Sequence, residues 1–172
     1  RQIMQLSKET LNLIKNFSSI NGSLMLKAGN KLATISEGKN VMSEVTIAET
    51  FPSDFGIYDL NEFLNVVSLF SDTNLDFSEK YVLVSGGGNS KIKYFAAGEG
   101  VVKAAPATIK FPSADVTFTL EAGQLAMIQR TSSVLKASDV SIVGADGKLK
   151  VIVSDKKNDT SNAYEVTLGD TD

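Results

Sequence analysis

Apolar residues recur at helical spacing in three segments of the chain. Because such spacing places them on one face of a helix, it predicts helices over 8–20, 60–71 and 122–136. Ser7 and Asp59 precede the first two segments and are good N-cap residues. The residues expected on the buried faces are Leu11, Leu13, Ile14, Phe17 and Ile20 in the first helix, Leu60, Phe63, Leu64, Val67 and Phe70 in the second, and Leu125, Ile128 and Leu135 in the third.

Shorter apolar or alternating runs lie between these helices, each bounded by residues typical of turns, and such runs predict β-strands. The predicted strands cover 23–28, 31–36, 41–48, 55–58, 74–78, 81–86, 91–97, 116–120, 139–144, 148–154 and 162–168. Gly86, Gly87 and Gly88 fall between two of these strands. They lack the spacing of a phosphate-binding loop and precede no helix, so we interpret them as a hairpin turn.

The order of one helix followed by three strands recurs along the chain, which indicates an internal duplication. The residues that recur 114 positions later are Leu11, Ile14, Ser18 and Ser19, which return as Leu125, Ile128, Ser132 and Ser133. We expect two βαβββ modules in a first domain, 1–97, and one module in a second domain, 114–172, with residues 98–113 as connector. The predicted fold is α+β, with helices on one face of antiparallel sheets. The second domain is expected to be incomplete, because it holds half of the pair.

The composition excludes several classes of function. The 172 residues include no cysteine and no histidine, which removes thiolate catalysis, zinc–thiolate sites and the commonest general base. The acidic residues form no convergent pair, so we predict no catalytic residue, no metal site and no cofactor. No apolar run approaches the roughly 18 residues needed to cross a bilayer. The net charge of −3 disfavours coating of nucleic acid by bulk attraction, but it leaves a local basic surface possible.

The polar faces of the predicted helices carry lysine, arginine, asparagine and serine with hardly any carboxylate. The residues on these faces that could lie against DNA are Lys8, Asn12 and Lys15, then Asn61 and Asn65, then Arg130, Ser133 and Lys136. Side chains of this kind can reach backbone phosphates without reading bases. Ordinary solvated helix faces explain the pattern equally well.

Four stretches of the chain resemble the sliding clamps of T4-type bacteriophages, which are processivity factors of DNA polymerase. They are LSKETLNLIKNFSSINGSLMLKAG (6–29), IYDLNEFLNVVSLFSD (57–72), FPSADVTF (111–118) and YEVTLGDTD (164–172). The last one resembles a stretch well inside the second domain of that family. The resemblance therefore implies a clamp subunit, truncated at its C-terminal end, that acts in the cytoplasm of the infected bacterial host.

The family fold implies three subunits closed into a ring around duplex DNA, with helices lining the inner wall. The residues listed above would then face DNA, and the ring would tether the polymerase after a clamp loader had placed it. The resemblance also implies a homotrimer joined by pairing of strand 91–97 with strand 162–168 of the next subunit. The edge of strand 42–48 would remain unsatisfied, because its partner belongs to the missing module.

Two questions stay open from the sequence. Val101, Val102 and Ile109 in the connector are candidates for docking of the polymerase or loader, but a connector without a recognition role is equally consistent with them. The alternative to a clamp is a β-rich phage structural or assembly protein that uses the same duplicated module without DNA. A carboxylate-poor set of helix faces favours the clamp, because an assembly protein has no need of it.

Overall fold

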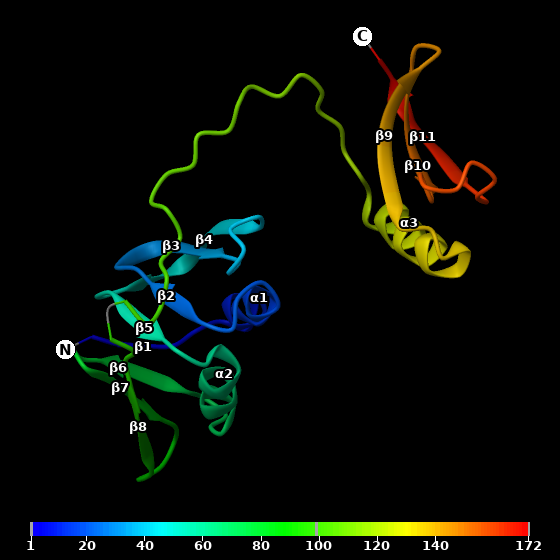
Figure 1. The fold of residues 1–172 in the computed structure, drawn as a ribbon. Helices are drawn as coiled ribbons and strands as arrows, with labels where there is room; N and C mark the ends of the chain where they lie inside the picture. The colour runs from blue at the N-terminus through cyan, green and yellow to red at the C-terminus, as the bar shows by residue number, and fades with distance from the viewer. Residues whose placement is uncertain (1, 99, 172) are drawn as a thin grey trace. The chain divides into compact units, whose positions relative to one another are not determined.

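The computed structural model describes residues 2–98 and 100–171 of the chain. They divide into two compact units, Arg1–Ile109 and Lys110–Asp172 (Figure 1). The first unit therefore includes most of the segment that the sequence suggests as a connector, 98–113. No helix among the described residues is long and apolar enough to cross a membrane.

The first unit consists of two βαβββ modules in series. The elements of the first module are β1 (Ile3–Met4), α1 (Lys8–Ser18), β2 (Leu24–Leu26), β3 (Gly29–Ile35) and β4 (Met42–Phe51), and those of the second are β5 (Phe55–Ile57), α2 (Leu60–Ser68), β6 (Asn74–Phe77), β7 (Tyr81–Ser85) and β8 (Lys91–Phe95). The sequence predicts every one of these elements except β1, which has only two residues. Gly86 to Gly88 form the predicted hairpin turn between β7 and β8.

Each module of the first unit gives its first strand to the other module. β1 pairs antiparallel with β6, so that Met4 lies opposite Leu75, and β5 pairs antiparallel with β2, so that Leu24 lies opposite Ile57. The sheet that begins with β1 therefore has the order β1-β6-β7-β8. Neither module has a complete sheet without the other.

The core of the first unit lies between the strands and the two helices, which Figure 1 shows side by side. Ile14 and Phe63 carry the buried faces of α1 and α2 and are fully enclosed. The Phe77 ring makes T-shaped contacts with the rings of Phe51 and Phe55, at centroid distances of 5.8 and 5.2 Å. Burial of such side chains stabilises the fold by about 1.5–3 kcal/mol each. The periodicity of the apolar residues thus correctly predicts which face of each helix is buried.

Side-chain caps fix both ends of α1. Ser7 is the predicted N-cap, and its hydroxyl accepts a hydrogen bond from the Thr10 amide at 3.2 Å. Glu49 on β4 accepts hydrogen bonds from the Ser7 amide at 2.5 Å and the Thr10 hydroxyl at 2.7 Å. At the other end, the Ser18 and Ser19 hydroxyls bond to carbonyls three residues back. These bonds compete with the helix ladder, and α1 ends two residues before the predicted boundary.

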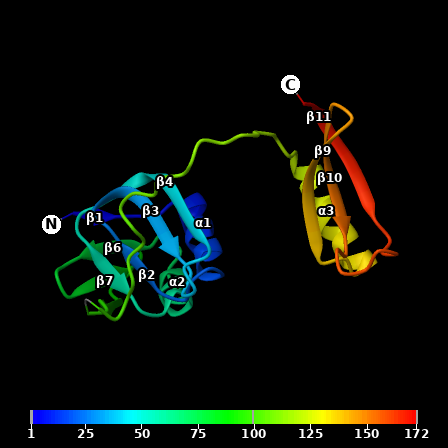
Figure 2. The same ribbon diagram turned by 45° about the horizontal axis from the view of Figure 1, so that its top comes forward.

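The second unit consists of one helix on one face of a three-stranded sheet (Figure 2). Its elements are α3 (Ala122–Leu135), β9 (Asp139–Ala145), β10 (Lys148–Ser154) and β11 (Tyr164–Asp170), in the sheet order β11-β10-β9. Ile128 is buried as predicted, but Leu125 is half-exposed, which corrects the expectation for that residue. The predicted strand over 116–120 is wrong, since these residues form no strand.

The contrast with the first unit explains the missing strand at 116–120. The corresponding strand of the first module, β1, is held by hydrogen bonds to β6 of the second module. The described residues of the second unit include no counterpart of β6, so the segment has no strand with which to pair. An isolated extended segment is not stable in water without such a partner.

Glu49→Gln is expected to destabilise the first unit by about 1 kcal/mol at neutral pH, because the charged acceptor for Ser7 and Thr10 is lost. Burial raises the pKa of Glu49, but the hydrogen bonds from Ser7 and Thr10 outweigh it, and the pKa lies below its usual value. The stability supplied by the carboxylate is therefore complete at neutral pH and is lost as the pH falls through this lowered pKa.

Denaturant unfolding of both proteins as a function of pH measures this effect. The difference between wild type and Glu49→Gln should shrink toward zero in acid. Glu37→Gln is the matched control, because Glu37 is exposed in the turn between β3 and β4 and should show no such difference. A gap for Glu49→Gln that stays constant down to the acid limit would contradict the assignment.

Candidate nucleic-acid interface

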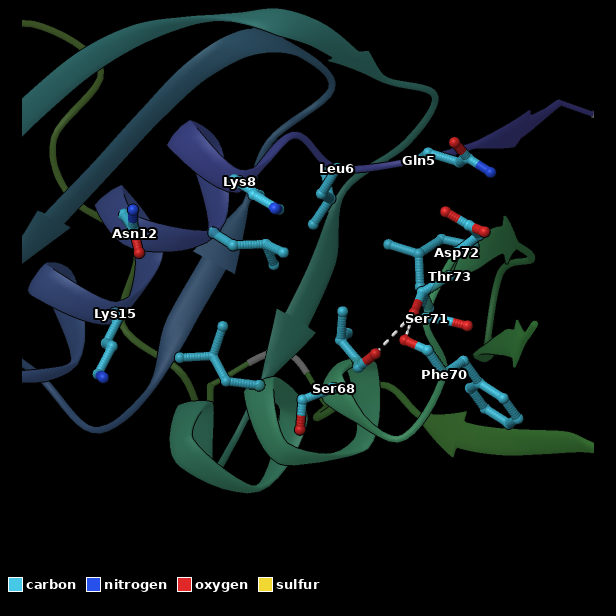
Figure 3. Close-up of a pocket in the computed structure, with 14 residues that line it drawn as sticks. Gln5, Leu6, Lys8, Asn12, Lys15, Ser68, Phe70, Ser71, Asp72 and Thr73 are labelled. Carbon is cyan, nitrogen blue, oxygen red and sulfur yellow. Dashed lines mark hydrogen bonds between the residues drawn. The ribbon is translucent and has the colours of Figure 1, made fainter. Parts of the chain in front are cut away.

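Three polar residues predicted to face DNA form a row along the exposed side of α1. Lys8, Asn12 and Lys15 are all exposed and follow one another along α1 (Figure 3). Ile14, on another side of the helix, is buried. The two ammonium groups belong to residues two helical turns apart, which corresponds to about 10 Å along the helix axis. The sequence therefore correctly predicts that these residues share one exposed face.

This row borders a groove between α1 and α2 of about 390 Å³. Ser68 on α2 lies across the groove, and Ser71 and Asp72 lie beyond the end of α2 (Figure 3). The end of α2 is fixed by Thr73, whose hydroxyl donates hydrogen bonds to the carbonyls of Val67 and Phe70 at 2.6 and 3.0 Å. The groove thus combines two lysines with neutral hydroxyls and amides and one carboxylate near one end.

The second helix contributes different residues to this groove from those that the sequence suggests. Asn61 and Asn65 are exposed on α2, but neither borders the groove. Ser68 does, because it lies on the flank of α2 that turns toward α1, and Ser71 does so from the segment beyond the end of α2. Sequence spacing separates the buried face from the exposed face, but it does not indicate which flank meets a neighbouring helix.

The exposed face of α3 carries a single arginine. Arg130 and Ser133 are exposed and three residues apart, so they share the face opposite Ile128. Lys136 lies just past the helix as its C-cap, in the left-handed region with φ 52°. It is exposed, but its side chain leaves from outside the regular helix. Met127 and Val134 are also exposed on α3, which makes this surface more apolar than that of α1.

The arrangement offers positive charge and hydrogen-bond donors. The first turns of α1 and α2 each hold one exposed glutamate, Glu9 and Glu62, neither of which borders the groove. Within residues 2–98 and 100–171, no three His, Cys, Asp or Glu side chains come together where a metal ion could bind. Such a surface can attract a polyanion.

The segment after β8 is partly built into the first unit. Val102 is 4% exposed, whereas its neighbour Val101 is 59% exposed, and Ile109 is also exposed. Residues 104–107 border a groove of about 210 Å³ with Met25, Ala33 and Glu44. Val102 is therefore a packing residue, and Val101 and Ile109 are the predicted docking residues that a partner could touch.

Two strands lie at the ends of their sheets. β8 is at one end of the order β1-β6-β7-β8, and β11 is at one end of β11-β10-β9. Their bounds differ from the predicted ones. β8 ends at Phe95 and not at residue 97, and β11 covers Tyr164–Asp170 and not 162–168. Both strands alternate between half-buried and exposed residues, so each presents one apolar and one polar face beside an open edge.

Comparison with known proteins relates the chain to factors of DNA replication. Residues 7–101 match a family described as DNA polymerase processivity factor. A sliding clamp of Vibrio phage KVP40 is 30% identical over 98% of this chain and 79% of the relative, and one of Enterobacteria phage T4 is 34% identical over 98% and 76%. A chain in the crystal structure of the PCNA2-PCNA3 complex from Sulfolobus tokodaii has a TM-score of 0.60 at 13% identity, over 98% of this chain and 76% of that one.

Val102→Ala is expected to lower the free energy of unfolding of the first unit by about 1–3 kcal/mol, because it removes two buried methyl groups. Val101→Ala makes the same chemical change at the exposed neighbouring position and should stay within about 0.5 kcal/mol of wild type. Denaturant unfolding of the two variants separates these outcomes. Equal effects would show that the segment is not anchored through Val102.

Proposed function

Given that this chain belongs to the family of DNA polymerase processivity factors, which includes the sliding clamps of T4-type phages, we propose that it forms a ring around duplex DNA and tethers the polymerase there. The alternative of a phage assembly protein is not favoured, since the family match covers more than half of the chain. The first unit is then one whole clamp domain, and the second unit is half of another. The protein acts in the cytoplasm of the infected host, where phage DNA is copied.

The observation that carries the proposal is the exposed side of α1. Lys8 and Lys15 lie on one face with Asn12 between them, and the groove beside them is lined by apolar and neutral polar side chains, with Asp72 as the one carboxylate among them. Two lysines in a row can follow the phosphates of one DNA strand without contacting base edges. Asn61, Asn65, Arg130, Ser133 and Lys136 are proposed as further pore residues, of which Arg130 and Lys136 are charged.

A weakly basic pore suits a clamp that must slide. Each phosphate contact releases counterions and strengthens binding, so many lysines would hold the ring at one place. A closed ring needs no tight contact, since it cannot leave the DNA sideways. The polymerase that it holds stays at a high effective concentration near the primer end. The proposed role is therefore topological, and it requires no catalytic residue and no cofactor.

The proposed ring is a homotrimer in which β8 of one subunit pairs antiparallel with β11 of the next. The polar face of β8 carries Lys91 and Lys93, and that of β11 carries Glu165. On the other face, Ile92 of β8 and Val166 of β11 pack against the cores of their own units. Pairing would thus join lysine to glutamate on one face and apolar to apolar on the other, and it would hide both edges.

Polymerase and clamp loader are proposed to dock at the segment after β8. The groove beside residues 104–107 is lined by alanines and by Met25, with the aliphatic stem of Lys31 nearby. Val101 and Ile109 add exposed apolar surface at either end of this segment. A short apolar peptide from a partner could bury these residues together.

Lys8→Glu with Lys15→Glu is expected to abolish most stimulation of the phage polymerase on primed circular DNA. Loss of two phosphate contacts should also reduce the slope of log affinity against log salt by about 2. The matched control is Lys39→Glu with Lys80→Glu, because both lysines are exposed in turns of the first unit and the net charge changes equally. Normal loading and sliding of the Lys8/Lys15 variant would show that α1 does not face DNA.

The subunit interface is tested by exchanging charges between β8 and β11. Lys93→Glu and Glu165→Lys should each weaken assembly by about tenfold, since like charges would then face each other across the interface. The two changes in one chain should restore assembly, whereas Lys39→Glu should have no effect. Sedimentation equilibrium measures the oligomer. Glu165 also pairs with Lys150 of its own unit at 2.9 Å, so circular dichroism checks that the second unit of each variant is folded. Failure of a folded double variant to recover would reject the pairing, as would a strict monomer at every concentration of the wild type.

A further inference from the structure

The outer face of β7 and β8 carries a pair of aromatic residues. Tyr81 lies opposite Phe95 in the antiparallel ladder, and their rings make a T-shaped contact with centroids 6.0 Å apart. Both rings lie on the side of the sheet away from the core, because Val82 and Val84 take the buried positions of β7. Phe95 is 64% exposed. The core of the first unit therefore does not account for this aromatic pair.

Lys93 places its ammonium group over these rings. It lies opposite Leu83, one diagonal step from Tyr81. The Nζ atom is 4.5 Å from the centroid of the Tyr81 ring and 5.9 Å from that of the Phe95 ring, and both distances are within the range of a cation–π interaction. An exposed lysine loses many rotamers when it forms an ion pair, and this loss opposes pairing. The Tyr81 ring restricts the ammonium group to one position before any partner arrives.

The carboxylate of Glu165 on β11 is also held in place. Lys150 of the neighbouring strand β10 forms an ion pair with it at 2.9 Å, and the hydrogen bond within this pair raises the pKa of Lys150. The side chain of Glu165 is still 51% exposed, so a second cation can approach it. Both partners of the proposed Lys93–Glu165 contact are thus oriented within their own subunits.

The residues beside this contact are also complementary. In an antiparallel ladder, the register that sets Lys93 opposite Glu165 sets Phe95 opposite Ala163, because each lies two residues further along its strand. Ala163 is small and exposed, so it leaves room for the Phe95 ring. Assembly in this register would cover the exposed ring and join the two charges at the same time.

Given the homotrimer of the proposed function, on which this role rests, we propose that Tyr81 positions Lys93 for its ion pair with Glu165 of the next subunit. An ammonium group has three N–H donors, so contact with the ring face leaves donors that point away from the ring toward the carboxylate. Ordering of Lys93 in the free subunit lowers the entropy cost of the ion pair. Tyr81 acts through Lys93 and needs no contact with the partner subunit.

Sedimentation equilibrium of the full chain, without DNA, measures trimer formation. Tyr81→Leu should weaken each interface about threefold, which is the size of an exposed cation–π interaction. Because a closed trimer has three identical interfaces, the overall trimerisation constant should fall about 30-fold. Tyr81→Phe keeps the ring and should behave like wild type. Leu83→Ala is the control on the same strand, because Leu83 lies opposite Lys93 but offers no ring, and it should leave the constant nearly unchanged.

A double-mutant cycle separates positioning of Lys93 from packing of the sheet. In the Glu165→Gln background the carboxylate is absent, so Tyr81→Leu should have no further effect on trimer formation. Nuclear magnetic resonance tests the geometry directly. The methylene protons next to Nζ of Lys93 should be shifted upfield by the ring current of Tyr81, and they should return to the ordinary lysine position in Tyr81→Leu.

The outcomes distinguish the role of Tyr81 from the ring itself. Equal trimer formation by wild type and Tyr81→Leu would overturn the role of Tyr81 and leave the homotrimer standing. A loss in Tyr81→Leu that persists in the Glu165→Gln background would assign Tyr81 to sheet packing and overturn it as well. Unshifted Lys93 methylene signals in wild type would overturn it whatever the variants do. A wild type that is monomeric at every concentration would reject the homotrimer and this role together.

Discussion

The exchange of first strands between neighbouring modules is the interaction on which the rest of the structure depends. β1 completes the sheet of the second module, and β5 completes that of the first. Each module alone would leave unpaired backbone groups and an uncovered apolar face, both of which are costly in water. When two modules exchange strands, each one pairs the backbone groups and covers the apolar face of the other, and the first unit is compact for this reason.

The same exchange positions the candidate DNA surface. Because the strands of the two modules interlock, α1 and α2 are held side by side on the same core, and the groove forms between them. The cap from Glu49 ties the start of α1 to β4, so the helix that carries Lys8 and Lys15 is fixed at its N-terminal end. Both lysines are exposed, so the phosphates of the proposed interface could reach their ammonium groups.

The second unit shows what one module does when no other module exchanges a strand with it. Its helix and hairpins form, because their hydrogen bonds and the contacts of Ile128 with Val151 are local to the module. Its first strand does not form, because the partner of that strand would come from elsewhere. Secondary structure that depends on neighbours in sequence is therefore present, and secondary structure that depends on another module is not.

The sequence by itself determined the duplicated modules, the three helices, the N-caps of α1 and α2 at Ser7 and Asp59, and the buried faces of these two helices. These features follow from periodicity and local hydrogen bonding, which neighbouring residues specify. Only the tertiary structure decided that β1 exists, that 116–120 forms no strand, that Leu125 is half-exposed, that Val102 is buried and that Ser68 rather than Asn61 or Asn65 borders the groove. Each of these features depends on how one element packs against another. The spacing of residues along one element carries no information about the element packed against it.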